Sequence, residues 1–265
     1  MASNLVTNLQ AKPYPIESVT KVGAYEPFDL QVARNQIMGH SVQNIYGYQT
    51  AVTTTNIPLW ENAAAYVYPV SATSMNLVST NNADTATITI VGLNANYVLT
   101  TEAVVLTGTT PVATVNSFLR INSMAVSVGS LTNPAGTITL KDPTNTTTYA
   151  QINTGIGRTQ MSIFTVPAGY TFYLSRVDCN SSFNGNNANY VTYKNYNVSA
   201  TGVVTVTQQS PFTAWYHSQR VMPRAFAEKT DLQFQFQTSA GTAAVNCSVE
   251  GYLIQNDGQA LPSAL

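Results

Sequence analysis

Residues 232–237 read Leu-Gln-Phe-Gln-Phe-Gln, so an apolar side chain alternates with an amide through three repeats. The alternation returns in residues 245–253, where apolar residues or glycine alternate with polar residues. Successive side chains of a strand point to opposite faces of a sheet, so this period of two predicts two β-strands. Residues 238–242 lie between them and include a glycine, which predicts that the two strands form a hairpin.

The same pattern covers much of the chain upstream. In residues 85–91, Ile88 and Ile90 fall on one face while threonines fall on the other. Strand-like runs that recur roughly every ten residues, without helical windows between them, predict antiparallel sheets packed over each other. The predicted fold class is therefore all-β, an antiparallel β-sandwich of jelly-roll type. The other runs cover residues 97–107, 119–128, 137–140, 161–166 and 170–177.

The first sixty residues differ from the rest, because prolines interrupt them and no period of two persists. They predict an extended N-terminal arm, residues 1–60, with one short helix in residues 28–37. Residues 61–142 then form a first β unit and residues 143–265 a second, with a turn-rich boundary at residues 141–146. The pattern leaves open whether these units form one large sandwich or two in tandem.

The composition is poor in charge. Charged residues make up 9% of the chain and hydrophobic residues 44%, whereas an ordinary domain has roughly 25% charged residues. Surface made of hydroxyl and amide groups is desolvated at lower cost than charged surface, so it suits broad contact with neighbouring subunits. We expect a self-assembling protein, a homotrimer or another symmetric oligomer, and not a disordered chain.

The charge distribution and hydropathy exclude two partner classes. The net charge is −1 and no Lys/Arg stripe is interleaved with aromatic residues, so we expect no nucleic acid partner. No run approaches 18 apolar residues and no secretion signal begins the sequence, so we expect synthesis in a cytoplasm without membrane insertion. Cys179 and Cys247 lie in strand-like segments and are expected to be free thiols.

No motif points to catalysis. His40 and His217 are the only histidines and lack companions at metal-ligand spacing, and the twelve carboxylates are dispersed. We therefore expect no catalytic residues, no metal and no cofactor. Arg120 lies between two apolar residues, Leu119 and Ile121, so it is expected either to pair with Glu102 across a sheet or to be solvated.

Aromatic residues gather around the Asn-rich segment 180–190, which predicts a long exposed loop. Tyrosine and tryptophan suit a protein or glycan contact because each joins an apolar ring to a polar group. Packing at the rim of the sandwich would use the same residues, and both interpretations stay open. The candidate contact surface, which includes two residues of the predicted helix, consists of Phe28, Val32, Phe183, Tyr190, Tyr193, Tyr196, Trp215 and Tyr216.

Several segments in order resemble one family. Residues 93–97 read Leu-Asn-Ala-Asn-Tyr, residues 108–112 read Gly-Thr-Thr-Pro-Val, and residues 116–122 read Asn-Ser-Phe-Leu-Arg-Ile-Asn. This series resembles virion structural proteins of marine tailed phages, with later landmarks in residues 164–170 and 228–232.

The resemblance implies a particle component located in the virion and without enzymatic activity. It is compatible with a capsid decoration or cement protein and with a head-fibre or tail component. The implied partners are further copies of the chain and other virion proteins such as the capsid lattice. The alternative function is a receptor- or glycan-binding module of a fibre with a host-surface glycan as partner, and a glycan hydrolase is a third, weaker hypothesis.

Overall fold

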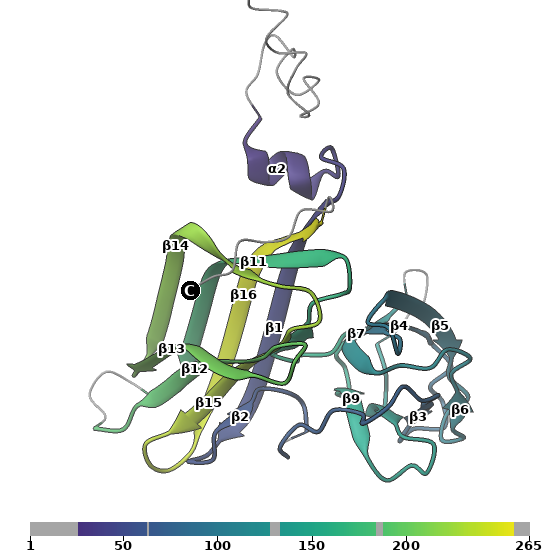
Figure 1. Cartoon of the computed structure of the whole chain (residues 1–265). Helices are drawn as coiled ribbons and strands as arrows, with labels where there is room; N and C mark the ends of the chain where they lie inside the picture. Colours follow the sequence, from purple (N-terminus) through teal and green to yellow (C-terminus); the bar gives the residue numbers. More distant parts are fainter. Residues whose placement is uncertain (1–25, 63, 128–132, 184–187, 257–265) are drawn as a thin grey trace, which may run out of the picture. The chain divides into compact units, whose positions relative to one another are not determined.

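A computed structural model describes residues 26–62, 64–127, 133–183 and 188–256 (Figure 1). The chain divides at residue 40 into two units, residues 1–40 and residues 41–265. Residues 1–25 of the predicted arm lie outside the described residues. The described part of the first unit holds the helix α2 (Phe28–Ala33), and the second unit holds the sheets.

Helix α2 is shorter than the predicted helix of residues 28–37. Pro27 stands at its N-cap, and the helix ends at Ala33 because Asn35 adopts a left-handed conformation with φ of 56°. Val32 is buried, whereas Phe28 is 43% exposed. A six-residue helix depends on burial of side chains such as Val32, because its own hydrogen bonds barely offset the cost of nucleation.

The second unit is built of antiparallel strands, which confirms the all-β prediction. The strands are β1 (His40–Val52), β2 (Ile57–Pro58), β3 (Asn76–Ser79), β4 (Thr87–Leu93), β5 (Leu99–Val105), β6 (Val112–Ala113), β7 (Arg120–Val126), β8 (Ile138–Lys141), β9 (Thr148–Ile152), β10 (Ile163–Thr165), β11 (Tyr170–Ser181), β12 (Val191–Val198), β13 (Val204–Phe212), β14 (Trp215–Phe226), β15 (Asp231–Thr238) and β16 (Ala243–Gln255).

These strands divide among four sheets. Sheet A has the order β1-β16-β11-β14, and sheet B has the order β10-β15-β12-β13, with β2 also paired to β15. Sheet C has the order β6-β3-β8-β9, and sheet D the order β5-β4-β7. By sheet count alone, the arrangement resembles a four-bladed propeller as much as a jelly-roll sandwich.

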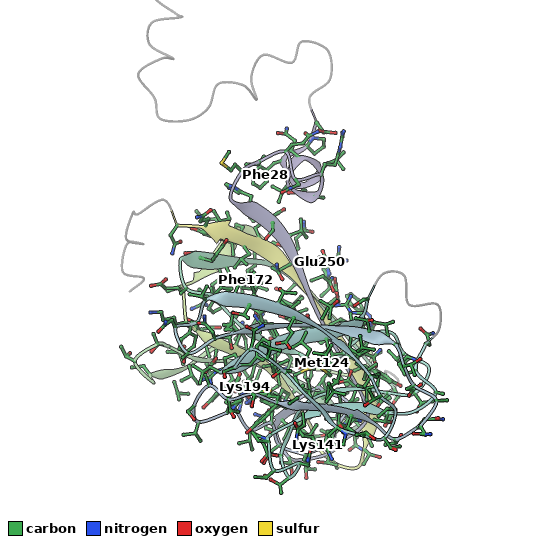
Figure 2. All side chains as sticks on the ribbon, turned by 90° about the vertical axis from the view of Figure 1, so that its right-hand side faces the viewer. Phe28, Met124, Lys141, Phe172, Lys194 and Glu250 are labelled. Atoms are coloured by element: carbon green, nitrogen blue, oxygen red, sulfur yellow. The ribbon has the colours of Figure 1, made fainter. Side chains whose placement is uncertain are left out.

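Buried side chains form two hydrophobic cores. The larger core combines residues of sheets A and B, such as Phe172 of β11 and Phe234 of β15. The smaller core combines residues of sheets C and D, such as Leu77 of β3 and Met124 of β7. Phe172 and Met124 mark the two cores in Figure 2. We call sheets A and B the larger body, and sheets C and D the smaller body.

Residues 40–60 differ from the predicted arm. Residues 40–52 form β1, a 13-residue strand of sheet A, and residues 57–58 form β2. The period of two was hidden because Gly47 and Gln49 occupy inward positions where an apolar residue is expected. Gly47 is required there, since an added Cβ would lie 2.6 Å from the Cβ of Ser162.

The predicted boundary at residue 142 is wrong, because it falls inside the smaller body. β8 pairs with β9 across residues 142–147, so the turn-rich stretch joins two neighbouring strands of sheet C. The carboxylate of Asp142 accepts hydrogen bonds from the backbone N–H groups of Thr146 and Thr147, each at 2.7 Å. With the Thr144 hydroxyl, these donors hold the pKa of Asp142 below its ordinary value.

The predicted hairpin of residues 232–253 is also wrong. β15 belongs to sheet B and β16 to sheet A, so residues 239–242 carry the chain from one sheet to the other. β15 is buried on both faces, and the amides of Gln233 and Gln235 hydrogen-bond to each other at 2.7 Å. Gln233 and Gln235, which alternate with the apolar residues, therefore lie inside the protein.

Cys179 and Cys247 lie directly opposite each other on β11 and β16 and are free, buried thiols with their Sγ atoms 3.5 Å apart. Burial raises the pKa of Cys179 well above its ordinary value. The Cys179 thiol therefore stays protonated, and both buried side chains act as small apolar groups in the larger core.

Two segments, residues 59–61 and residues 160–162, connect the two bodies and run beside each other. Ser162 donates its backbone N–H to the carbonyl of Leu59 at 2.8 Å, and the Leu59 N–H donates to the Ser162 hydroxyl at 2.8 Å. Next to them, Glu61 accepts a hydrogen bond from the backbone N–H of Gln160, while its Oε2 is buried without a partner among the described residues. Burial raises the pKa of Glu61 to about 7.

We expect Glu61 to make stability depend on pH. Because its pKa is raised from 4.5 to about 7 on folding, the folded chain holds the proton more tightly than the unfolded chain. The contribution is fully present below pH 4.5 and is lost as pH rises through about 7. Glu61→Gln should remove this loss and stabilise the protein at pH 8 by about 1–3 kcal/mol. Urea denaturation at pH 5 and pH 8 checks this, and equal effects at both values would contradict it.

A buried ion pair joins the smaller body to sheet B. Arg120 of β7 donates from Nε and Nη2 to the two carboxylate oxygens of Asp231 of β15, both at 2.9 Å. Its guanidinium lies 4.4 Å from the centre of the Tyr68 ring. Arg120 is therefore neither paired with Glu102 nor solvated, so both predicted alternatives are wrong. Glu102 instead accepts hydrogen bonds from backbone N–H groups of the loop before β7.

Candidate functional site

Strand β13 forms one edge of sheet B, and strand β14 forms one edge of sheet A (Figure 1). Most of their residues are exposed or half-buried, in contrast to the central strands. Large apolar side chains stand on these edges, with Val206 of β13 49% exposed and Met222 of β14 84% exposed. We call the exposed valine and methionine residues of the two strands the edge patch: Val204, Val206, Val221 and Met222.

The edge patch includes a bulge in β14. Between two paired positions, β11 supplies only Ser175, whereas β14 supplies residues 220–223. The extra residues leave the ladder, and Val221 is fully exposed as a result. Arg224 donates to the carbonyl of Thr207 at 3.4 Å, which brings this part of β14 close to β13.

Polar side chains of β13 and β14 hydrogen-bond to each other, and further polar groups lie nearby on β12. Arg220 donates to the Oε1 of Gln208 at 2.6 Å, and Asn197 donates to the Thr207 hydroxyl at 3.1 Å. The Tyr193 hydroxyl and both side-chain polar atoms of Asn195 are buried and have no partner among the described residues. Unpaired buried polar groups lower stability, so this end of the larger core holds its edge strands less firmly than an apolar core would.

The outward side of sheet A carries a second surface, which we call the outer face. The register places three rows of outward side chains across β14, β11 and β16, because directly opposite residues of an antiparallel pair share a face. From β14 to β16, the rows are Trp215, Asn180 and Asn246; His217, Asp178 and Ser248; and Gln219, Arg176 and Glu250.

Hydrogen bonds fix several groups of the outer face. His217 Nδ1 lies 2.5 Å from Asp178 Oδ1, and Arg176 Nε lies 2.5 Å from Asp178 Oδ2. In the next row, Asn180 donates its amide to Asn246 at 3.2 Å. Trp215 stands beside them with 69% of its surface exposed. The outer face therefore presents a flat array of oriented polar groups with one large aromatic ring.

The predicted contact residues fall into three groups. Trp215, Tyr190 and Phe28 are exposed, and Tyr196 and Tyr216 are half-buried. The remaining three are buried, so they cannot belong to a contact surface, and the structure corrects the prediction for Val32, Phe183 and Tyr193. Tyr193 is inward because β12 places it opposite Phe236 in the larger core, where its ring packs 5.5 Å from that of Phe236.

Tyr190 lines a shallow cavity of about 530 Å³ on the sheet B side of the larger body. Its walls include Thr192 of β12 together with Gln209 and Phe212 of β13. Residues 180–190 were predicted to form an exposed loop. The first two of them, residues 180–181, belong to strand β11, and residues 184–187 lie outside the described residues. The cavity offers one aromatic ring, an amide and hydroxyl groups.

Among the described residues, no three His, Cys, Asp or Glu side chains are grouped closely enough to hold a metal ion. His217 and Asp178 form a pair that could orient a base, but Ser218 points to the opposite face of β14. Among those same parts of the chain, no helix is both long and apolar enough to span a membrane.

Neither a protein-family model nor a curated protein matches this chain.

Proposed function

We propose that this protein is a non-enzymatic structural component of a tailed-phage virion, of the capsid decoration, cement or fibre type. In this proposal the larger body is a jelly-roll sandwich that carries the smaller body, a second sandwich, as an insertion. The protein assembles into a homotrimer or another symmetric oligomer through its edge strands, and its partners are further copies of itself and other virion proteins such as the capsid lattice.

The order of the strands carries this proposal. Consecutive strands of the larger body alternate between its two sheets: β10 in sheet B, β11 in A, β12 and β13 in B, β14 in A, β15 in B and β16 in A. In a propeller, consecutive strands stay within one blade, so the alternation favours a jelly roll. β2 and β10 both pair with β15, so they act as one strand that the smaller body interrupts.

Jelly rolls of eight strands recur in viral capsid proteins and lectins. A fold does not determine a function, so the proposal also depends on the surface. The charged fraction is 9%, and the edge patch leaves apolar side chains and unpaired strand edges exposed. Free edges invite pairing with another chain, and symmetric association would cover them.

Purified virions of a phage that encodes this chain provide the test. We expect the protein as a band on a stained gel, in hundreds of copies per particle for a lattice component and in few copies for a tail or fibre component. The copy number therefore separates the two locations. Absence of the chain from virions, with abundant protein in the lysate, would overturn the proposal.

A receptor- or glycan-binding module is the second candidate. Trp215, 69% exposed within a polar sheet face, favours it, since tryptophan joins a large apolar ring to an N–H donor and is enriched at contact surfaces. This candidate is compatible with a virion location, because a fibre binds host glycans while belonging to the particle.

A further inference from the structure

We propose that the outer face of sheet A is a glycan-binding platform for neutral pyranose oligosaccharides, with one sugar ring stacked on Trp215. The inference deepens the second candidate function and rests on it. It places the site on the outward side of sheet A, where Trp215 of the predicted contact surface lies opposite Asn180, the first residue of the Asn-rich segment.

The first argument is the combination of groups. A pyranose presents an apolar C–H face and a rim of hydroxyls, so it needs an aromatic ring beside donors and acceptors that lie in the same plane. Trp215 supplies the ring, and the opposite position on β11 holds Asn180, whose neighbour on β16 is Asn246. An amide both donates and accepts, which matches a hydroxyl group.

The second argument is preorganisation. Asn180 is held by Asn246, and Asp178 is held by both His217 and Arg176, so these side chains are oriented before a ligand arrives. All of them project from paired strands and not from loops. Ordering fewer side chains on binding lowers the entropic cost, which matters for a weakly bound sugar.

The third argument is charge, which selects a neutral glycan. Asp178 and Glu250 stand beside Arg176 and His217 on the face, and Asp178 already contacts both basic groups. An acidic glycan meets no surplus of positive charge here, and no large aliphatic side chain occupies the three rows to favour an apolar protein partner.

The two tryptophans of the chain make the test direct. Trp60 is 2% exposed and Trp215 is 69% exposed, so acrylamide quenching of fluorescence in the full-length protein reports on Trp215. The probes are cellohexaose, mannohexaose, chitohexaose and laminarihexaose. We expect at least one of them to protect Trp215 saturably. Asn180→Ala and Asn246→Ala should each raise its dissociation constant about fivefold to tenfold, the value of one or two lost hydrogen bonds.

Trp215→Ala lacks the fluorescent reporter, so calorimetry measures its binding of the same oligosaccharide. We expect its affinity to be at least about tenfold weaker than that of the wild type. Tyr190→Ala is the matched control at the sheet B cavity and should bind like the wild type. If an oligosaccharide binds but only Tyr190→Ala weakens it, the platform is wrong while glycan binding stands. If none of the four binds, both ideas fail. Unchanged melting temperatures show that the variants are folded.

Discussion

Arg120→Ala is expected to destabilise the protein by about 3–5 kcal/mol, because it leaves the Asp231 carboxylate buried without its counter-ion. Only 12% of the Arg120 side chain and 9% of the Asp231 side chain are exposed. Arg120 also donates to the carbonyls of Leu119 and Pro69, at 2.9 and 3.3 Å. Burial lowers the pKa of Arg120, but the hydrogen bonds and charge of Asp231 more than offset this and raise it above its ordinary value.

Urea denaturation of Arg120→Ala and of a matched control measures the effect. The control is Arg176→Ala, which breaks an ion pair with Asp178 in which 45% of the arginine side chain is exposed. Exposed pairs contribute about 0–1 kcal/mol, so the two variants should differ several-fold. Replacing both Arg120 and Asp231 with leucine should cost less than Arg120→Ala alone, because no charge remains buried. Equal losses in Arg120→Ala and Arg176→Ala would contradict the prediction, because the buried pair would then contribute no more stability than an exposed one.

Val221→Asp is expected to dissociate the proposed oligomer while leaving the fold of each chain intact. Val221 is fully exposed on the β14 bulge, so within one chain the change should alter stability by no more than about 0.5 kcal/mol. In the proposed oligomer the same carboxylate would be buried without a partner. We expect the dissociation constant to rise at least about a hundredfold, which corresponds to roughly 2.7 kcal/mol.

Val115→Asp is the matched control for this variant. Val115 is 91% exposed in the loop between β6 and β7 of the smaller body, outside the edge patch. It introduces the same charge at a comparably exposed valine. Sedimentation velocity of both variants across a concentration series measures the association. If Val115→Asp and Val221→Asp dissociate the oligomer equally, net charge and not the edge patch governs assembly.

The sequence predicted strands better than it predicted their partners. The alternation around Ile88 and Ile90 and in residues 232–237 marks real strands, β4 and β15. The hairpin prediction failed because local pattern does not show that β15 is buried on both faces, and residues 239–242 are long enough to change sheets. β1 was missed because a glycine and a glutamine stand at inward positions.

The candidate surfaces were predicted only in part. Trp215 was identified from its residue type and is exposed. Its polar companions were missed, because Asp178 and His217 are 39 positions apart and meet only through the register of β11 and β14. A signal was present in β11, where Arg176, Asp178 and Asn180 alternate with inward residues. The tyrosine prediction failed at Tyr193, since residue type alone does not distinguish a core ring from a surface ring.

The central claim is that the low-charge surface and free edges of this chain are covered by further copies of itself. Sedimentation equilibrium of the purified full-length protein at micromolar concentration tests this most directly. The account predicts a single closed species of two, three or more chains, with no larger aggregates. A stable monomer throughout the concentration range would contradict it.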